Sequence, residues 1–368
     1  MSKFKNKKIT RALIVCDSFK GSLSSEEVGR CIQAALKNKG IPSDYLLVSD
    51  GGEGFLDALK FGRPSLEKHY LPTCDSLFRK IDGLFLKDGD TLYFSLADVV
   101  GLFLLKAREV DAYRNSTYGL GYLMRQAINA HRPKNVVLSL GGSCTNDLGL
   151  GFLEGLGAKV FDGDKQINRV TLKDFDRITR IDLTDVLDLT SDIKFTTLTD
   201  VGNPLCGERG ATKVYGEQKG LQKSELERVD NMLAGVKDLI LSAANNAHDP
   251  SNNSGSGAAG GVGFTVQAVF RSEIKSGIDE LLKTIEFGER IKKYDLVITG
   301  EGCFDEQSLN GKVVCGVMKY GIQNLVIVSA IKKLEYLNAY SIVPDITTKK
   351  NSMKEPKKYL AELIDRIF

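Results

Sequence analysis

Short apolar runs that lead directly into clusters of Gly, Asp and Ser recur along this chain. The clearest is the run Leu-Val-Ile at residues 296–298, which continues into Thr-Gly-Glu-Gly at 299–302, and residues 12–16 and 136–140 show the same pattern. Apolar runs of this length that are rich in β-branched residues indicate buried strands. In open α/β sheets, ligands bind at the carboxyl ends of the strands. The pattern therefore predicts an α/β fold in which several strand ends converge on one crevice.

Helix signals between the apolar runs agree with this fold class. Ser24 and Glu27 have the spacing of a capping box at the start of a helix, and a second box is predicted at Ser224 and Glu227. Residues 45–48 predict a further strand. Strands that alternate with helices are typical of parallel α/β sheets.

The length and a change of pattern predict two domains. At 368 residues the chain exceeds the size of an ordinary single domain. Residues 84–86 and 92–96 flank Asp-Gly-Asp at 88–90, which is a hairpin signal rather than a crossover. We therefore place a domain boundary near residue 75. The charged run at residues 347–358 is predicted to be solvated surface.

Composition narrows the class of function. The formal net charge of +3 gives no case for a nucleic-acid partner, and no apolar stretch approaches the roughly 20 residues that span a membrane. The seven cysteines are scattered without a C-x-x-C pair, which indicates a reducing cytoplasm. None of the three histidines lies in a glycine-rich loop, so we predict that any general base is a carboxylate or a lysine.

Polar residues in the first and last loops are candidates for a ligand site. Lys20 lies just before a predicted helix N-terminus, which favours anions. Asp50 lies in the glycine-rich loop 49–54, which suits a ligand or a bound metal ion, although acids in loops more often cap a helix. The loop after residue 298 adds charge and hydrogen-bonding groups at Glu301, Asp305, Gln307 and Lys312.

The middle of the chain offers candidate phosphate-binding loops. The backbone N–H groups of Gly141 and Gly142, with the hydroxyls of Ser143 and Thr145, form a predicted phosphate cradle. Residues 255–260 match G-x-G-x-x-G, but a loop precedes them where a dinucleotide fingerprint requires a strand, so we interpret them as an anion site that opens a helix. Cradles, cations and carboxylates together suit phosphoryl transfer, so the residues predict a nucleotide- or phosphate-handling enzyme.

Seven sequence blocks, in order over roughly residues 10 to 330, closely resemble bacterial glycerate kinase of the first type. The blocks are Asp17-Ser-Phe-Lys-Gly-Ser-Leu23, Asp50-Gly-Gly-Glu-Gly54, Gly141-Gly-Ser-Cys-Thr-Asn-Asp147, Asp200-Val-Gly-Asn-Pro-Leu205, Glu217-Gln-Lys-Gly220, Gly257-Ala-Ala-Gly-Gly261, and Thr299-Gly-Glu-Gly302 with Gly311-Lys312. The chain departs from the family pattern at Leu120, where members usually carry threonine, and at Cys303, where they usually carry arginine.

The resemblance implies a fold and an activity. The implied activity is ATP-dependent phosphorylation of D-glycerate to 2-phospho- or 3-phosphoglycerate, with Mg²⁺. The implied fold has two α/β domains with the active site in the cleft. These are a Rossmann-like domain from residues 1–75 and 285–368 and an inserted flavodoxin-like domain at residues 76–284. A related protein that binds a nucleotide or hydroxy acid without turnover, and a kinase for another small sugar acid, remain alternatives.

Roles for the charged residues follow from this activity. Asp200 is the predicted base for the glycerate hydroxyl, with Asp305 as the alternative. Lys20 and Lys312 are predicted to contact the transferred phosphate or the glycerate carboxylate from opposite sides of an interdomain cleft.

Asp50 and Glu301 are the predicted magnesium ligands. The remaining predicted substrate- and phosphate-binding residues are Asp17, Ser18, Ser22, Gly51, Gly52, Gly141, Gly142, Ser143, Thr145, Asn146, Asn203, Gly257, Gly260, Gly300, Gly302 and Gln307. We expect a cytoplasmic enzyme with ATP and D-glycerate as its partners and with neither nucleic acid nor membrane. A homodimer is left open.

Overall fold

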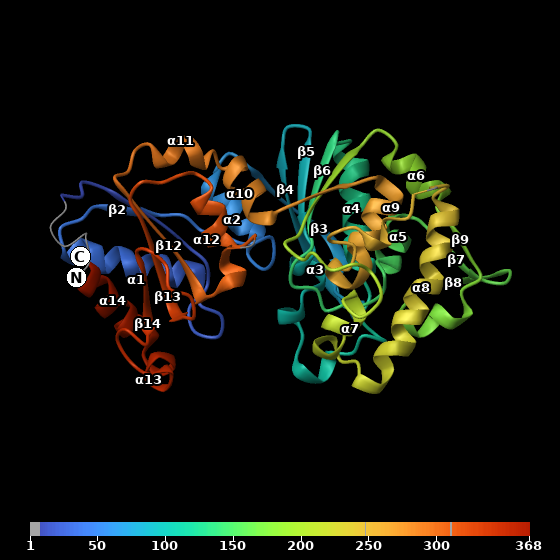
Figure 1. Cartoon of the computed structure of the whole chain (residues 1–368). Coiled ribbons are helices and arrows are strands. Elements are labelled where there is room, and N and C mark those ends of the chain that lie inside the picture. The colour runs from blue at the N-terminus through green and yellow to red at the C-terminus, as the bar shows by residue number, and fades with distance from the viewer. Residues whose placement is uncertain (1–7, 247, 310) are drawn as a thin grey trace. The chain divides into compact units, whose positions relative to one another are not determined.

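A computed structural model of the protein describes residues 8–246, 248–309 and 311–368. The chain forms two compact units (Figure 1). Unit 1 consists of the chain up to Asp50, Asp57–Pro64 and Ile278–Phe368, and unit 2 consists of Gly51–Leu56 and Ser65–Gly277. The main changes of unit lie between Pro64 and Ser65 and between Gly277 and Ile278, whereas the predicted boundaries were residues 75 and 285. The assignment of these units as Rossmann-like and flavodoxin-like domains remains a prediction.

Unit 1 is built on a parallel five-stranded sheet with the order β14-β13-β12-β1-β2. Its strands are β1 (Ala12–Cys16), β2 (Ser43–Tyr45), β12 (Leu296–Phe304), β13 (Leu325–Lys332) and β14 (Ala339–Val343). Its helices are α1 (Ser25–Asn38), α2 (Phe55–Gly62), α10 (Gly277–Thr284), α11 (Phe287–Ile291), α12 (Val313–Met318), α13 (Lys349–Lys354) and α14 (Pro356–Ile367).

Helices α1 and α14 lie side by side in unit 1 (Figure 1). The predicted capping box of Ser24 and Glu27 is present at the start of α1. The charged run at residues 347–358 is mostly exposed, as predicted, but it is helical. The next helical turns bury Leu360 and Leu363 in the core of unit 1. The charged run gives no sign in the sequence of this buried helix face.

Unit 2 contains a mixed six-stranded sheet with the order β11-β10-β6-β5-β4-β3. Its first four strands in this order are parallel, whereas β5, β4 and β3 pair antiparallel, which confirms the predicted hairpin. The strands are β3 (Glu67–Cys74), β4 (Lys80–Asp88), β5 (Thr91–Ser95), β6 (Asn135–Ser139), β10 (Lys194–Leu198) and β11 (Glu273–Lys275). A small antiparallel sheet adds β7 (Lys159–Asp162), β8 (Lys165–Ile167) and β9 (Arg180–Asp182).

The helices of unit 2 enclose one continuous hydrophobic core. They are α3 (Ala97–Val100), α4 (Tyr118–His131), α5 (Leu150–Leu156), α6 (Thr184–Thr190), α7 (Ala211–Tyr215), α8 (Leu226–Ala243) and α9 (Val262–Phe270). Leu120 of α4 is fully buried in this core, so the departure from the family pattern at this position is a change in packing. The α/β fold class predicted from the sequence is confirmed.

Three local predictions were wrong. Strand β12 continues to Phe304 through the predicted loop, because β13 pairs beside it as far as Lys332. Strand β2 ends at Tyr45, where the predicted strand begins. The capping box before α8 is formed by Gln222 and Glu225, which belong to a 3₁₀ turn, instead of Ser224 and Glu227.

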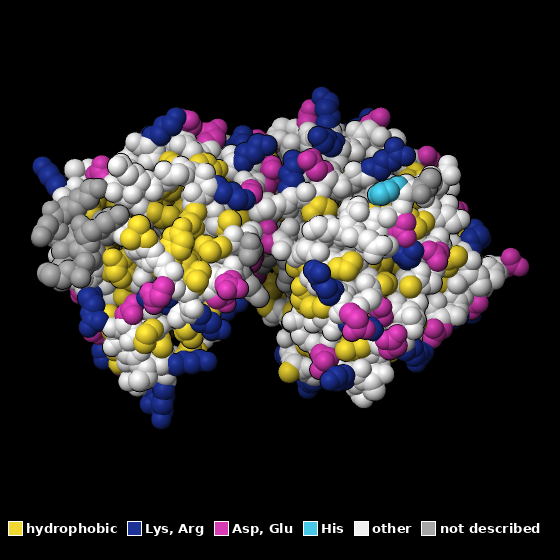
Figure 2. Space-filling model, viewed as in Figure 1, with side chains coloured by type: hydrophobic (Ala, Val, Ile, Leu, Met, Phe, Trp, Pro, Cys, Tyr) yellow, Lys and Arg dark blue, Asp and Glu magenta, His cyan; other side chains and the backbone are white. Residues whose placement is uncertain are grey.

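Among the described residues, no helix combines the length and the apolar character needed to cross a membrane. On the visible face of each unit, Lys and Arg side chains are interspersed with Asp and Glu side chains (Figure 2).

Candidate functional site

The carboxyl end of β1 lies beside the middle of β12 in unit 1. Cys16 and Gly300 are partners in this parallel pair, and the N–H of Asp17 donates to the carbonyl of Gly300 at 2.8 Å. Gly300 is required here because a Cβ atom would lie 2.0 Å from the carbonyl oxygen of Val328 on β13. This pairing brings Asp17 next to the segment that carries Glu301.

Asp17 lies in an acidic environment. Burial, together with the charges of Asp50 and Glu301, raises its pKa to about 7. The N–H of Ser18 and the charge of Lys20 act in the opposite direction. Asp50 and Glu301 therefore both lie close enough to Asp17 to disfavour its charged form.

Glu301 is the most buried of these acids. Its exposure is 6%, burial raises its pKa, and its Oε1 atom has no hydrogen-bond partner among the described residues. Its other carboxylate oxygen, Oε2, lies 3.6 Å from Nζ of Lys312, the residue that caps α12. A buried carboxylate oxygen without a partner is unusual and indicates that another ligand can bind there.

Lys20 and Lys312 both belong to unit 1. The prediction placed them on opposite sides of an interdomain cleft, whereas both belong to the same unit. Their contact with the transferred phosphate or the glycerate carboxylate stays a prediction. Lys20 follows β1 and is exposed, whereas Lys312 follows β12 and is half-buried. The backbone N–H of Lys20 lies near Gly302, where a Cβ atom would come within 3.2 Å of the Lys20 nitrogen.

The other predicted residues of unit 1 have mainly local contacts. Ser22 donates to the carbonyl of Phe19 at 2.9 Å and closes the turn after β1. The N–H of Asp305 donates to the hydroxyl of Ser308, and the thiol of Cys303 lies 3.7 Å from Oδ2 of Asp305. The side chain of Gln307 lies outside the described part of the structure.

A magnesium ion fits this acidic cluster only if substrate phosphates and waters supply part of its ligands. Among the described residues, no three His, Cys, Asp or Glu side chains are arranged to hold a metal ion by themselves. Mg²⁺ usually keeps several waters and binds one or two carboxylates together with substrate phosphates. The free Oε1 of Glu301 and the nearby Asp50 are suitable donors for such a site.

In unit 2, glycines bring four loops into backbone contact. A Cβ atom on Gly141 would lie 2.5 Å from Cα of Gly52, one on Gly260 would lie 2.2 Å from the carbonyl oxygen of Thr145, and one on Gly257 would lie 2.3 Å from that of Pro204. These glycines therefore pack the loops against one another. The G-x-G-x-x-G segment opens a kinked 3₁₀ turn, and α9 begins only at Val262.

The predicted phosphate cradle is altered by this packing. The N–H of Gly141 donates to the carbonyl of Gly51 at 3.1 Å, so it is not an exposed donor as predicted. The N–H of Gly142 is the remaining backbone donor of the two. Thr145 is fully buried and its hydroxyl has no partner among the described residues.

Lys219 lies beneath this loop, although sequence reasoning did not select it as a site residue. It ends a 3₁₀ turn (Glu217–Lys219) and is 3% exposed. Its Nζ donates to Oγ of Ser143 at 2.9 Å and to the carbonyl of Thr145 at 2.7 Å. Burial lowers its pKa to about 8. The only signal in the sequence was its place in the block Glu217–Gly220.

Asp200 and Asn203 follow β10 in unit 2. Asp200 is exposed directly after the strand. The side chain of Asn203 donates to the carbonyl of Arg209 at 2.7 Å and accepts from the hydroxyl of Tyr215 at 2.9 Å. Asn146 is buried and donates to Oγ1 of Thr212 at 3.0 Å, while its Oδ1 has no partner in the described part of the chain.

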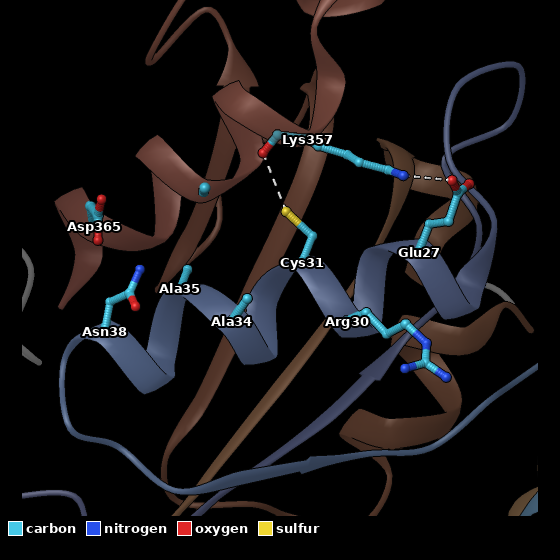
Figure 3. Close-up of a pocket in the computed structure, with 9 residues that line it drawn as sticks. Glu27, Arg30, Cys31, Ala34, Ala35, Asn38, Lys357 and Asp365 are labelled. Carbon is cyan, nitrogen blue, oxygen red and sulfur yellow. Dashed lines mark hydrogen bonds and ion pairs between the residues drawn. The ribbon is translucent and has the colours of Figure 1, made fainter.

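Three pockets in the described structure are lined by none of the predicted site residues. One of about 320 Å³ lies between α1 and α14 (Figure 3). There, Lys357 pairs with Glu27 at 2.8 Å and its carbonyl accepts from the thiol of Cys31 at 3.2 Å. The other two, of about 650 and 840 Å³, lie in unit 2 beside Tyr118 and along α8.

Comparison with known proteins gives consistent matches along the chain. The model of the glycerate kinase family matches residues 12–368. A protein of Escherichia coli (strain K12) named glycerate 2-kinase is 33% identical over 311 residues, covering 83% of this chain and 81% of the relative. A glycerate kinase of Neisseria meningitidis serogroup B is 31% identical over 369 residues, covering 97% of each chain.

A solved structure matches the fold as well. The crystal structure of a Salmonella typhimurium LT2 protein provisionally named glycerate kinase 2 superposes with a TM-score of 0.76 at 27% identity, covering 97% of each chain.

Proposed function

This chain belongs to the glycerate kinase family, and on that premise we propose that it transfers the γ-phosphoryl group of ATP to D-glycerate. The observation that carries the proposal is the family match over residues 12–368, combined with opposite electrostatic environments at the strand ends of the two units. Phosphoryl transfer depends on positioning and charge stabilisation more than on covalent catalysis by the protein.

We assign the nucleotide phosphates and Mg²⁺ to unit 1. Asp50 and Glu301 would hold the ion, and Asp17 adds to the negative potential that attracts it. When bound, Mg²⁺ would neutralise charge on the phosphates. Lys312 would bind a phosphate oxygen, because its ammonium lies 3.6 Å from Glu301, and Lys20 would add a second cation from the neighbouring loop.

We assign glycerate to the strand ends of unit 2. Strands β6 and β10 are neighbours, with Ser139 opposite Leu198, so the loops that carry Ser143 and Asp200 begin side by side. Asp200 would take the proton of the reacting glycerate hydroxyl while the oxygen of that hydroxyl bonds to the γ-phosphorus of ATP. The bond from phosphorus to the β-phosphate oxygen then breaks, and ADP leaves with its electron pair.

The position of the new phosphate is the finer part of the proposal. Because the Escherichia coli relative is named glycerate 2-kinase, we favour transfer to the 2-hydroxyl. We also infer a cytoplasmic enzyme, a location that suits the free cysteines of the described structure. A homodimer remains an open proposal.

The test is turnover with product identification. Purified protein with ATP, Mg²⁺ and D-glycerate should form ADP and phosphoglycerate, and omission of Mg²⁺ should abolish the reaction. Enolase without a mutase consumes only the 2-phospho product, so it distinguishes the two positions. Turnover with another sugar acid but not with glycerate would favour the second kinase alternative. Tight ATP binding without any turnover would favour the binding protein.

A further inference from the structure

We propose that Lys219 is a positioning residue that directs the hydroxyl proton of Ser143 toward the carboxylate of glycerate. The inference rests on the proposed function, because it assumes that glycerate binds at the strand ends of unit 2. It adds a residue and a contact that neither the family match nor the relatives assign.

The first argument is the direction of the hydrogen bonds. An ammonium group has only donors, so in the 2.9 Å contact between Lys219 Nζ and Ser143 Oγ the hydroxyl must accept. The hydroxyl proton of Ser143 is then left for another acceptor. Within the described residues, the hydroxyl of Ser143 has no second hydrogen-bond partner. Its oxygen is therefore held so that its proton can be donated to a bound molecule.

The second argument is the unpaired charge. Lys219 is almost fully buried, and in the described part of the chain no Asp or Glu lies within ion-pair distance of it. The carboxylate of Asp147 acts on it from beyond ion-pair distance, and burial keeps the Cys144 thiol neutral by raising its pKa to about 11. Asp147 already accepts hydrogen bonds from Thr117 and Gly149.

A buried cation without a direct ion-pair partner is costly to a fold. An anionic substrate near Ser143 would supply the missing opposite charge, and in a low-dielectric site this attraction is stronger than it would be in water.

The third argument is the state of the neighbouring polar atoms. Thr145 Oγ1 and Asn146 Oδ1 are buried and unpartnered within the described residues, and both lie in the same loop as Ser143. Buried polar atoms are nearly always paired in folded proteins. Three incompletely satisfied side chains in one short loop indicate that this loop is completed by a bound polar molecule.

A purely structural role for Lys219 makes different predictions. If the lysine only ties the loop together, its loss should weaken the fold and impair both substrates alike. If it positions Ser143, its loss should act on glycerate selectively, and the effect should depend on the presence of the Ser143 hydroxyl.

The experiment is a double-mutant cycle with Lys219→Met and Ser143→Ala, measured by steady-state kinetics for both substrates. We expect each single variant to raise the KM for D-glycerate about tenfold or more, with the KM for ATP changed less than about threefold. The double variant should be little worse than either single variant, because the two residues act as one unit. The matched control is Lys223→Met, which removes an exposed lysine four residues away.

Each outcome decides the inference. An unchanged glycerate KM in Ser143→Ala, or independent and multiplicative effects of the two substitutions, would overturn it. If Lys219→Met does not fold, Ser143→Ala and Lys219→Arg still decide, since arginine keeps the charge and the donors and should retain most of the glycerate affinity. Absence of glycerate turnover in the unmodified protein would instead reject the proposed function, and this inference with it.

Discussion

The two units differ in the sign of the charge that is buried in their candidate binding regions. In unit 1, the charges of Asp50 and Glu301 act on the buried Asp17, and together with burial they raise its pKa to about 7. In unit 2, the cation of Lys219 is buried beneath the loop that follows β6, and its pKa falls to about 8 because of burial. One region therefore favours a bound cation and the other a bound anion. A kinase needs both, since it handles a metal-bound nucleotide and an acidic acceptor.

The two regions also differ in what holds them. The unit 1 cluster is defined by side chains on a parallel sheet: Asp17 follows β1 and Glu301 lies within β12. The unit 2 site depends on backbones in contact at Gly141, Gly257 and Gly260. Side-chain substitutions in unit 1 should therefore change chemistry with little effect on folding. Glycine substitutions in unit 2 should act on the fold first.

The largest effect is expected from the proposed base. Asp200→Asn preserves the shape of the side chain and removes its basicity, so kcat should fall about 10²- to 10⁴-fold while the Kd for ATP is retained. Single-turnover kinetics and nucleotide titration measure the two quantities. If kcat is unchanged in this variant, Asp200 is not the base. The same measurement on Asp305→Asn then tests the alternative base in unit 1.

The next largest effect concerns the lysines of unit 1. Lys312→Ala and Lys20→Ala should each lower kcat/KM by about 10²-fold or more, because preorganised charge is a major contribution to phosphoryl transfer. Their melting temperatures should change little, because Lys20 is exposed and Lys312 is half-buried. The control is Lys292→Ala, which breaks only an exposed ion pair with Glu289. If Lys312→Ala or Lys20→Ala keeps near-normal kinetics, the substituted lysine is only a surface charge.

Local signals were sufficient for much of the fold. The run at residues 12–16 is β1, and the capping box at Ser24 and Glu27 begins α1, because both depend on neighbours in sequence. Residues 46 and 48 were misleading: they are apolar and buried, yet β2 ends at Tyr45. Burial of a side chain does not require its backbone to belong to a strand.

The candidate site was predictable only where charge follows a strand. Asp17 and Asp50 were selected because each follows a predicted strand, and Glu301 because it follows the apolar run 296–298, although it lies within β12. Their roles stay predictions. Lys219 was missed because its neighbours are polar and exposed, and its burial depends on Ser143 and Thr145, far away in sequence. For the same reason, the engagement of the Gly141 N–H by Gly51 could not be predicted.

A smaller effect, on stability, tests the backbone packing of unit 2. Gly260 has a φ of +67°, and a Cβ atom there would overlap the carbonyl of Thr145. Gly260→Ala should therefore reduce the free energy of unfolding by about 2 kcal/mol or more. Gly235→Ala in α8 meets no atom within 4 Å and should be neutral or stabilising by up to about 1 kcal/mol. If Gly260→Ala and the unmodified protein have equal unfolding midpoints in denaturant, the packing role of Gly260 is contradicted.

The smallest effect follows from the titration of Lys219. Its pKa is lowered from 10.5 to about 8 in the folded protein, so between these values the unfolded chain binds more protons than the folded one. The free energy of unfolding must then rise with pH in this window, by about 1 kcal/mol between pH 8 and pH 9 from this residue. Other groups titrate nearby, so the quantity to measure is the difference between the unmodified protein and Lys219→Met in chemical unfolding at both pH values. Bound D-glycerate should reduce this difference, because a carboxylate near Ser143 favours the charged lysine and raises its folded pKa toward the unfolded value. If D-glycerate leaves this difference unchanged, the bound substrate does not act on Lys219. That result would contradict the proposal that unit 2 binds the carboxylate of the acceptor.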